Sequence, residues 1–167
     1  MKKVSIRPIE KTDTGNIVRW RNLDEVRKNL IQQELITEES HLEFYKNHIL
    51  TKKRYQFIIH ISDGCLDMDI GSCFIKDIDT EKREAEFGIF IGESAARGKG
   101  YAKYAITELI KFGFDTLNLE KFFLVVLKSN EVAIAVYEKL GFERVETSVE
   151  SEFIRMELDK ESFRRYE

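Results

Sequence analysis

The stretch from residue 89 to residue 102 constrains the fold of this chain more than any other. An apolar, strand-like segment ends at Gly92, a short loop carries Gly98 and Gly100, and a helical pattern follows. A helix N-terminus has unpaired N–H groups and a partial positive charge, and glycines let a phosphate approach the backbone. The segment therefore predicts a strand–loop–helix junction suited to binding phosphate, where Arg97 and Lys99 supply cationic donors.

The glycine spacing excludes two common nucleotide-binding loops. A P-loop requires GxxxxGK followed by serine or threonine, and a dinucleotide fingerprint requires GxGxxG inside a βαβ unit. Neither pattern occurs in this chain. Taken alone, the RGKG string is equally compatible with a glycine-relieved turn before a surface helix.

Apolar periodicity predicts one domain over residues 1–167, with the element order βααβββαβαββ. Four helices are expected. The first has Asp13 as its N-cap, the second starts at Thr37, and the others cover residues 99–117 and 131–140. Strands are expected at residues 3–9, 55–61, 70–75, 84–91, 121–127, 142–147 and 153–158.

Composition and charge exclude several classes of protein. A net charge of −3 removes the long-range positive field of an indiscriminate nucleic-acid binder. No apolar segment approaches the roughly 18 residues of a membrane-spanning helix, and the N-terminal residues lack the apolar part of a signal peptide. We therefore expect a cytoplasmic protein that binds neither nucleic acid nor membrane. Cys65 and Cys73 lack metal-ligand spacing and are expected to be buried, reduced and inert.

A second motif follows downstream, with Asn130 through Ala133 and then Tyr137 through Phe142. Together with residues 97–102, it resembles the GNAT superfamily of acetyl-CoA-dependent N-acetyltransferases, whose motifs read Q/R-x-x-G-x-G/A and N-x-x-A with Y-x-k-x-G-F. The resemblance covers nearly the whole chain. It implies an α/β (α+β) fold with a mixed sheet of about seven mostly antiparallel strands, splayed between the fourth and fifth, and flanked by four helices.

The resemblance also implies where acetyl-CoA binds. The strands at residues 84–91 and 121–127 would diverge into a slot for pantetheine. The pyrophosphate would lie on the loop that enters the long helix. The residues implied to contact the coenzyme are Ile89, Phe90 and Ile91 through their backbone, Arg97, Gly98, Lys99, Gly100, Tyr101 and Ala102 in the loop, and Asn130.

The implied reaction is direct attack of an amine on the thioester, which requires no nucleophilic cysteine. Tyr137 is the implied acid for the departing thiolate, and Asn130 would bond the pantetheine amide or an ordered water. Packing beneath the sheet for Tyr137 and a helix N-cap for Asn130 are the alternatives. Glu86 is a candidate to relay the amine proton through water, or else a structural partner of a nearby arginine.

The acceptor is expected to lie against the first two helices, where Trp20, Arg21 and Asn22 are the candidate residues. With residues 41–44, 86–90 and 128–130, these residues resemble the N-acetyltransferase of pseudaminic acid biosynthesis, which acts on a UDP-linked amino sugar. Tryptophan could stack on a flat ring while arginine pairs a phosphate, although a core tryptophan between solvated charges is an equal alternative.

Two competing functions stay open. The first is the branch of ribosomal-protein N-terminal acetyltransferases, although residues 103–105 depart from that branch's G-x-G-Y-A-T-E-A loop. The second is a catalytically silent coenzyme A-binding module, against which Tyr137 and the intact loop argue. The expected partner is a small-molecule amine, such as a nucleotide-linked amino sugar, or a protein N-terminus, and the expected assembly is a monomer or homodimer.

Overall fold

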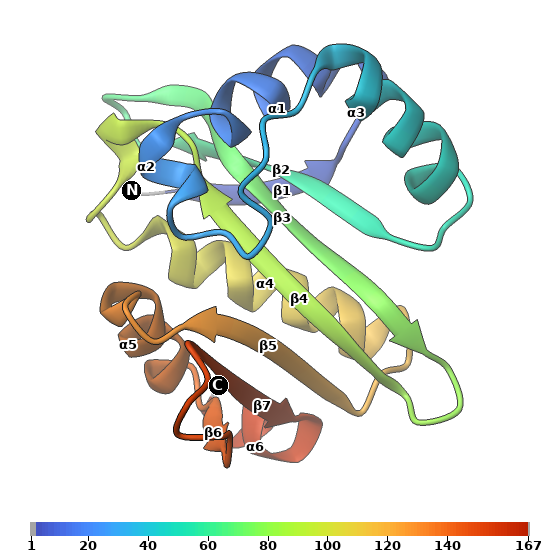
Figure 1. Ribbon diagram of the computed structural model, residues 1–167, viewed down its shortest axis with the longest axis vertical. Coiled ribbons are helices and arrows are strands. Elements are labelled where there is room, and N and C mark those ends of the chain that lie inside the picture. Colours follow the sequence, from blue (N-terminus) through green and yellow to red (C-terminus); the bar gives the residue numbers. More distant parts are fainter. Residues whose placement is uncertain (1–2, 167) are drawn as a thin grey trace.

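The computed structural model describes residues 3–166, and its centre is a seven-stranded sheet in the order β1-β2-β3-β4-β5-β7-β6 (Figure 1). Every neighbouring pair is antiparallel except β4 and β5, which are parallel. The strands are β1 (Lys3–Pro8), β2 (Tyr55–Ser62), β3 (Asp67–Asp79), β4 (Glu84–Ile91), β5 (Lys121–Leu127), β6 (Glu143–Val145) and β7 (Phe153–Asp159). The predicted mixed, mostly antiparallel sheet is confirmed.

The described residues contain six α-helices where four were predicted. They are α1 (Thr14–Arg21), α2 (Asp24–Arg27), α3 (Glu38–Phe44), α4 (Tyr101–Asp115), α5 (Glu131–Lys139) and α6 (Lys160–Tyr166). Shorter helical turns are η1 (Lys11–Asp13), the π-helical η2 (Tyr45–Ile49) and η3 (Ser94–Ala96). The first predicted helix is interrupted because Leu23 is extended, with φ −66° and ψ 133°. The terminal helix α6 was not predicted. Cys73 on β3 is buried as expected, but Cys65 is exposed because it lies in the turn between β2 and β3.

Asp13 precedes α1 as predicted, but its carboxylate does not cap that helix. It accepts two hydrogen bonds from the Arg7 guanidinium, at 2.9 and 2.8 Å, and one from the Glu10 backbone N–H at 2.8 Å. The expectation of an Asp13 side-chain cap is therefore wrong. The bidentate pair instead fixes the start of α1 to β1.

The helices cover opposite faces of the sheet. Along β2, Phe57, Ile59 and Ile61 belong to the main apolar cluster with α4, whereas Ile58 belongs to a second cluster with Trp20 of α1. Because side chains alternate across a strand, these two clusters lie on opposite faces. The N-terminal helices and α4 therefore enclose the sheet between them (Figure 1).

The strands β4 and β5 are paired only at their first residues. The pairs are Glu84 with Lys121, Ala85 with Phe122 and Glu86 with Phe123, and the two strands then diverge (Figure 1). The predicted splay is confirmed. Because of this splay, the hydrogen-bond ladder is interrupted in the middle of the sheet, next to the loop that enters α4.

Candidate active site

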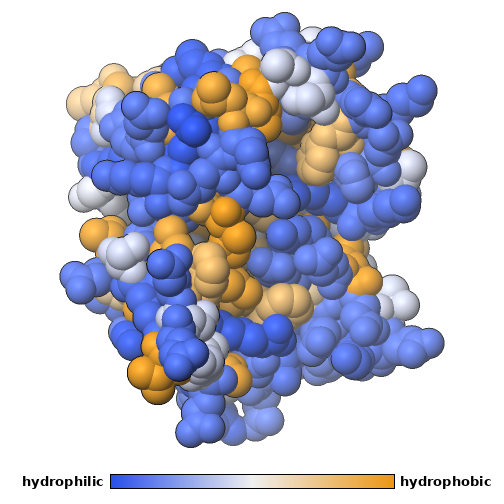
Figure 2. Space-filling model, viewed as in Figure 1, coloured by the Kyte–Doolittle hydropathy of each residue, from blue (hydrophilic) through white to orange (hydrophobic). Residues whose placement is uncertain are grey.

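A cleft of about 850 Å³ occupies the gap between the diverging strands. It is lined by backbone and side chains of β4, by β5, by the loop that enters α4, by α5 and by the segment after α1. Figure 2 shows a hollow across this face, with apolar side chains gathered along it. The two sequence motifs are thus brought together from opposite sides of one cavity.

Gly98 and Gly100 line the cleft and adopt left-handed backbone conformations, with φ of +71° and +81°. A Cβ atom at either position would have no heavy atom within 4 Å, so it would project into open space. Gly100 is the N-cap of α4, which directs the first N–H groups of a 15-residue helix toward this space. The loop therefore fits an anionic group such as a pyrophosphate.

Arg97 is largely committed to the loop itself. Its guanidinium donates to the carbonyl oxygens of Ile91 and Gly92, at 3.1 and 3.0 Å, and forms a 2.7 Å ion pair with Glu25 of α2. These three contacts leave further N–H groups of the guanidinium, and Arg97 lines the cleft, so its expected contact with the coenzyme stays a prediction. Arg97 ties the loop to β4 and to α2.

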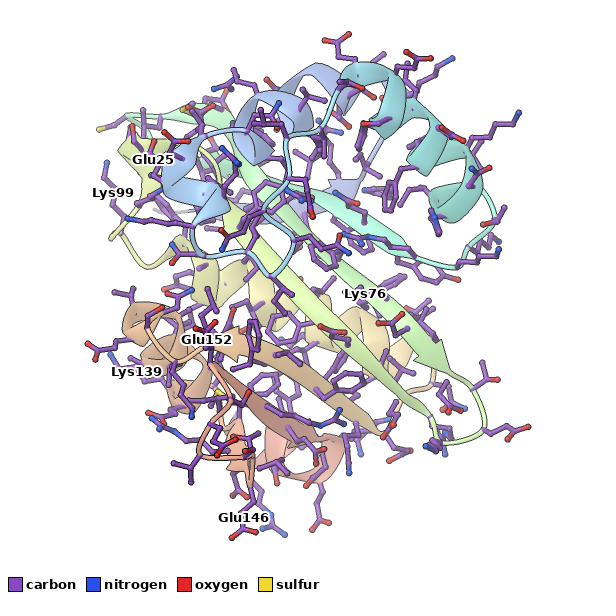
Figure 3. The ribbon with its side chains drawn as sticks, viewed as in Figure 1. Glu25, Lys76, Lys99, Lys139, Glu146 and Glu152 are labelled. Atoms are coloured by element: carbon purple, nitrogen blue, oxygen red, sulfur yellow. The ribbon has the colours of Figure 1, made fainter. Side chains whose placement is uncertain are left out.

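Tyr101 and Lys99 lie beside Asp63, in the turn between β2 and β3. The Tyr101 hydroxyl donates a short hydrogen bond to Asp63, which with two backbone bonds and nearby Lys99 lowers the pKa of that carboxyl to about 2. Tyr101 is almost fully buried, so it anchors the first turn of α4. Figure 3 shows Lys99 at the same edge of the molecule as Glu25. The coenzyme contacts expected of Lys99 and Ala102 stay predictions, although Ala102 does line the cleft.

Ile89, Phe90 and Ile91 line the cleft on β4. They pair with β3, through Cys73, Ser72 and Gly71, and have no ladder partner on β5. One side of this strand is therefore open for hydrogen bonding to a ligand. The Ile91 carbonyl is the exception to the expectation, because it accepts from Arg97.

Tyr137 lines the cleft from α5 and packs edge-on against Phe87, with ring centroids 5.5 Å apart. No described group hydrogen-bonds with its hydroxyl. Burial raises the pKa of Tyr137 to about 12, so the phenol keeps its proton at any physiological pH. The ring is packed, as one alternative expected, and the residue also reaches the cavity, so its role as the acid stays a prediction.

Asn130 is the N-cap of α5, where its Oδ1 accepts from the Ala133 N–H at 3.3 Å. This cap gives Asn130 a structural role, which was one of the two alternatives. Asn130 also lines the cleft, so a contact to the coenzyme stays a prediction.

Glu86 lies at the last paired position before β4 and β5 diverge, and its side chain lines the cleft. Burial raises the pKa of this carboxyl, which suits a group that accepts a proton and releases it again. Its ion-pair partner is Lys76 of β3, at 3.7 Å, rather than an arginine. Figure 3 shows Lys76 well away from Glu25 and Lys99, toward the other end of the cleft.

The structure corrects two of the three residues expected to bind the acceptor. Trp20 is 0% exposed, packs against Phe90 and donates from Nε1 to Glu93 at 2.7 Å, so it has no surface for stacking on a ligand. Asn22 donates to the Ile36 carbonyl at 2.8 Å and accepts from the Ile36 N–H at 2.9 Å. Both of these polar groups are used to hold the segment between α2 and α3. Only Arg21 lines the cleft.

The sequence did not single out Phe74, whose ring lies at the same end of the cleft as Arg54. The Arg54 guanidinium carbon lies 3.7 Å from the Phe74 ring centroid. A Cβ at Gly88 would come within 2.2 Å of the Phe74 ring, so glycine at that position allows the ring to lie flat on β4. Phe74 lies opposite Gly88 because β3 pairs with β4. A local sequence motif does not show which strands pair, so Phe74 could not be identified from the sequence.

His41 lies beneath this end of the cleft and is 5% exposed. Its Nδ1 hydrogen-bonds with the Thr14 hydroxyl at 3.0 Å, while its Nε2 is buried without a partner. Burial, helped by the charges of Arg54 and Arg21, lowers the pKa of His41 from 6.5 to about 4. The imidazole is therefore neutral in the folded protein at neutral pH.

We expect the free energy of unfolding to fall between pH 6.5 and about pH 4, partly because of His41. In that range the unfolded chain binds a proton that folded His41 refuses, at a slope of up to about 1.4 kcal/mol per pH unit. Urea unfolding of the parent, His41→Gln and the exposed-site control His48→Gln checks this. His41→Gln should flatten the pH dependence relative to both others, and identical slopes for all three proteins would contradict the assignment.

The sequence of the chain matches the family described as an acetyltransferase (GNAT) domain over residues 3–143. This match includes the loop that enters α4, α5 and both strands that border the cleft. The chain belongs to the GNAT family of acetyltransferases. Membership confirms the predicted fold, the predicted activity of acetyl transfer and the predicted donor, acetyl-CoA.

Relatives of this GNAT chain include spermidine acetyltransferases. It is 34% identical to the spermidine N(1)-acetyltransferase of Escherichia coli (strain K12) over 153 residues, which cover 90% of this chain and 76% of the relative. A Vibrio cholerae spermidine N-acetyltransferase, solved with CoA and spermine, superposes with a TM-score of 0.88 at 24% identity, over 96% of this chain and 97% of that one. A dodecameric structure of spermidine N-acetyltransferase from Vibrio cholerae gives 0.81 at 25% identity, over 98% of each chain.

These relatives correct the narrower resemblance drawn from the sequence. They are spermidine acetyltransferases and not enzymes of the pseudaminic-acid or ribosomal-protein branches. The physical reason lies in residues 20–22, which carried much of that resemblance. Trp20 and Asn22 serve packing and loop attachment, so their presence reports the shared architecture rather than the acceptor. No described helix is long and apolar enough to cross a membrane.

Proposed function

We propose that this GNAT chain transfers an acetyl group from acetyl-CoA to the primary amine of a small molecule. The observation that carries the proposal is the meeting of the Gly98–Gly100 loop, the open side of β4 and Tyr137 in one cleft. A cytoplasmic location and an assembly as a monomer or homodimer stay predictions.

Each end of the cleft has a distinct role in this proposal. The loop and the first turn of α4 hold the pyrophosphate, and the unpaired side of β4 beyond Glu86 holds the pantetheine arm. Bound acetyl-CoA supplies the thioester carbonyl that the amine attacks. Backbone N–H groups between residues 88 and 90 lie on the open strand and stabilise the developing oxyanion.

Two side chains move the protons. Glu86, with its raised pKa, accepts the proton of the attacking amine through a water molecule. Tyr137, which keeps its proton, donates it to the sulfur as the carbon–sulfur bond breaks and the carbon–nitrogen bond forms. Asn130 positions the start of α5, on which Tyr137 lies.

Three acceptor classes follow from the relatives and from the sequence. The similarity to spermidine acetyltransferases supports a polyamine. A nucleotide-linked amino sugar and a protein N-terminus, both expected from the sequence, are the alternatives. Arg21 on the cleft wall is a specific observation in favour of the nucleotide sugar, because arginine pairs phosphate through two parallel hydrogen bonds.

Thiol release from acetyl-CoA tests the proposed function. Purified protein with acetyl-CoA should release free thiol only when an amine acceptor is added, and mass spectrometry should find the acetylated amine. Spermidine, a UDP-linked amino sugar and a peptide with a free N-terminus represent the three classes. Tight coenzyme binding without thiol release for any amine would indicate the silent coenzyme A-binding module instead.

A further inference from the structure

Two arginines face the end of the cleft that lies away from the Gly98–Gly100 loop. Arg21 is the last residue of α1, and Arg54 immediately precedes β2. Both line the cleft, and the Nε atom of each is buried without a hydrogen-bond partner. Both arginines are half-buried, and a buried N–H donor that lacks an acceptor is costly to a fold, so the two Nε donors point to a ligand that completes them.

Arg54 lies against two aromatic rings. Its guanidinium carbon lies 3.7 Å from the ring centroid of Phe74 and 4.9 Å from that of Phe44. A ring face attracts the charge of the guanidinium but does not replace an oxygen acceptor for its N–H donors. No side chain or carbonyl in the described part of the chain accepts a hydrogen bond from this guanidinium. The aromatic contacts therefore orient the arginine without satisfying it.

Arg21 is only weakly satisfied. Its one hydrogen bond within the described residues is a long contact of 3.5 Å to the Gln32 carbonyl. Burial, helped by the charge of nearby Arg21, lowers the pKa of Arg54 to about 9. Both side chains still carry a positive charge at neutral pH. The protein thus holds two like charges together at one end of the cavity.

The nearby carboxylates do not pair with either arginine. Glu86 has Lys76 at 3.7 Å, and Glu25 is paired with Arg97 at 2.7 Å. Asp77 and Glu86 act on Arg54, and Glu34 acts on Arg21, through charge alone. Within the described residues, both guanidinium groups therefore lack a carboxylate partner. Spermidine, a polycation, supplies no acceptor for their N–H groups.

We propose that the acceptor of this enzyme carries an acidic group, a phosphate or a carboxylate, which Arg21 and Arg54 bind while its amine faces Glu86. This proposal rests on the proposed acetyl transfer and restricts its substrate class. It separates this chain in specificity from the spermidine acetyltransferases to which it is similar. Arg54, between Phe44 and Phe74, is the principal specificity residue.

A series of amines with similar short spacers tests the acidic group directly. Ethanolamine, O-phosphoethanolamine, β-alanine and 1,3-diaminopropane differ mainly in whether the second group is neutral, a phosphate, a carboxylate or a cation. Spermidine and a UDP-linked amino sugar extend the series. We expect kcat/KM to be roughly 10- to 100-fold higher for the best acidic amine than for ethanolamine, and lowest for the two polyamines.

The amines with a phosphate and those with a carboxylate distinguish which acidic group the acceptor carries. A preference for O-phosphoethanolamine and the UDP sugar assigns a phosphate, and a preference for β-alanine assigns a carboxylate. Spermidine or 1,3-diaminopropane turned over as well as every acidic amine overturns the inference while leaving acetyl transfer intact. Absence of thiol release with all six amines contradicts the proposed function itself.

Variants of Arg54 link the preference to the side chain. Arg54→Gln should raise the KM of the preferred acidic amine roughly 10- to 100-fold, leave the KM of acetyl-CoA unchanged and spare ethanolamine, while Arg54→Lys recovers only part. Lys53→Gln, at the exposed neighbouring residue, is the matched control. Equal losses for ethanolamine and the acidic amine would show that Arg54 is only structural.

The native protein gives a test that does not depend on folding of a variant. Inorganic phosphate should inhibit competitively against the preferred acidic amine and not compete with acetyl-CoA. Competition with acetyl-CoA alone would place phosphate on the loop that enters α4 and would overturn the acceptor-end assignment.

Discussion

Replacing Tyr137 by phenylalanine is expected to lower kcat roughly 10²- to 10⁴-fold, the loss typical of a missing general acid. The substitution keeps the ring that packs against Phe87 and Phe142 and removes only the hydroxyl. The pKa of about 12 for Tyr137 means that its proton is available at every working pH. Thiol release under saturating acetyl-CoA and amine measures the effect.

Coenzyme binding provides the internal check on that variant. Because the ring packing is retained, Tyr137→Phe should bind acetyl-CoA about as tightly as the parent. Tyr104→Phe, at an exposed tyrosine on α4, is the control for loss of a hydroxyl. Near-parental turnover of Tyr137→Phe would move the acid role elsewhere, with a water held by Asn130 as the next candidate.

Replacing Gly100 by glutamate is expected to abolish coenzyme binding. A ligand that binds only the folded state stabilises it by RT ln(1 + [L]/Kd), or roughly 2.7 kcal/mol at a hundredfold excess over Kd. The parent should therefore show a clear rise in Tm with acetyl-CoA. In Gly100→Glu, a side chain and a negative charge enter the space where the pyrophosphate is proposed to lie, so the rise should disappear.

The backbone at Gly100 requires a matched control. Its φ of +81° strains any L-residue, so Gly100→Ala shares the backbone cost but lacks the carboxylate. Both variants should melt below the parent without ligand, and Gly100→Ala should keep part of the ligand-induced rise. An undiminished rise for Gly100→Glu would show that the coenzyme phosphates lie away from the N-terminus of α4.

The local motifs predicted the junction between β4 and α4 well. A strand, two glycines and a helix are consecutive in the chain, and α4 follows β4 as expected. The divergence of β4 from β5 was also predicted, because the resemblance implies it. The ion pair of Arg97 with Glu25 of α2 was not predicted, because it joins segments far apart in the sequence.

The acceptor half was predicted less well, for a related reason. Trp20, Arg21 and Asn22 are consecutive, yet three successive residues of a helix point in different directions, so only one of them can face a given cavity. The break at Leu23 decides which one does, and it is not visible in the apolar spacing. Phe74 joined Arg54 only through the β2–β3–β4 pairing.

The short pairing of β4 with β5 separates two roles that a β-sheet usually combines. On the side of α4, the apolar cluster is continuous across the divide, from Ile75 of β3 through Phe87 to Phe122 of β5. Cohesion there comes from packing, which needs no ladder. Backbone N–H and C=O groups in the middle of the domain therefore stay unpaired within the sheet. A ligand can bind them, and only water competes with it for these groups. Bound pantetheine would then act as a temporary eighth strand, restoring a sheet that the polypeptide leaves incomplete.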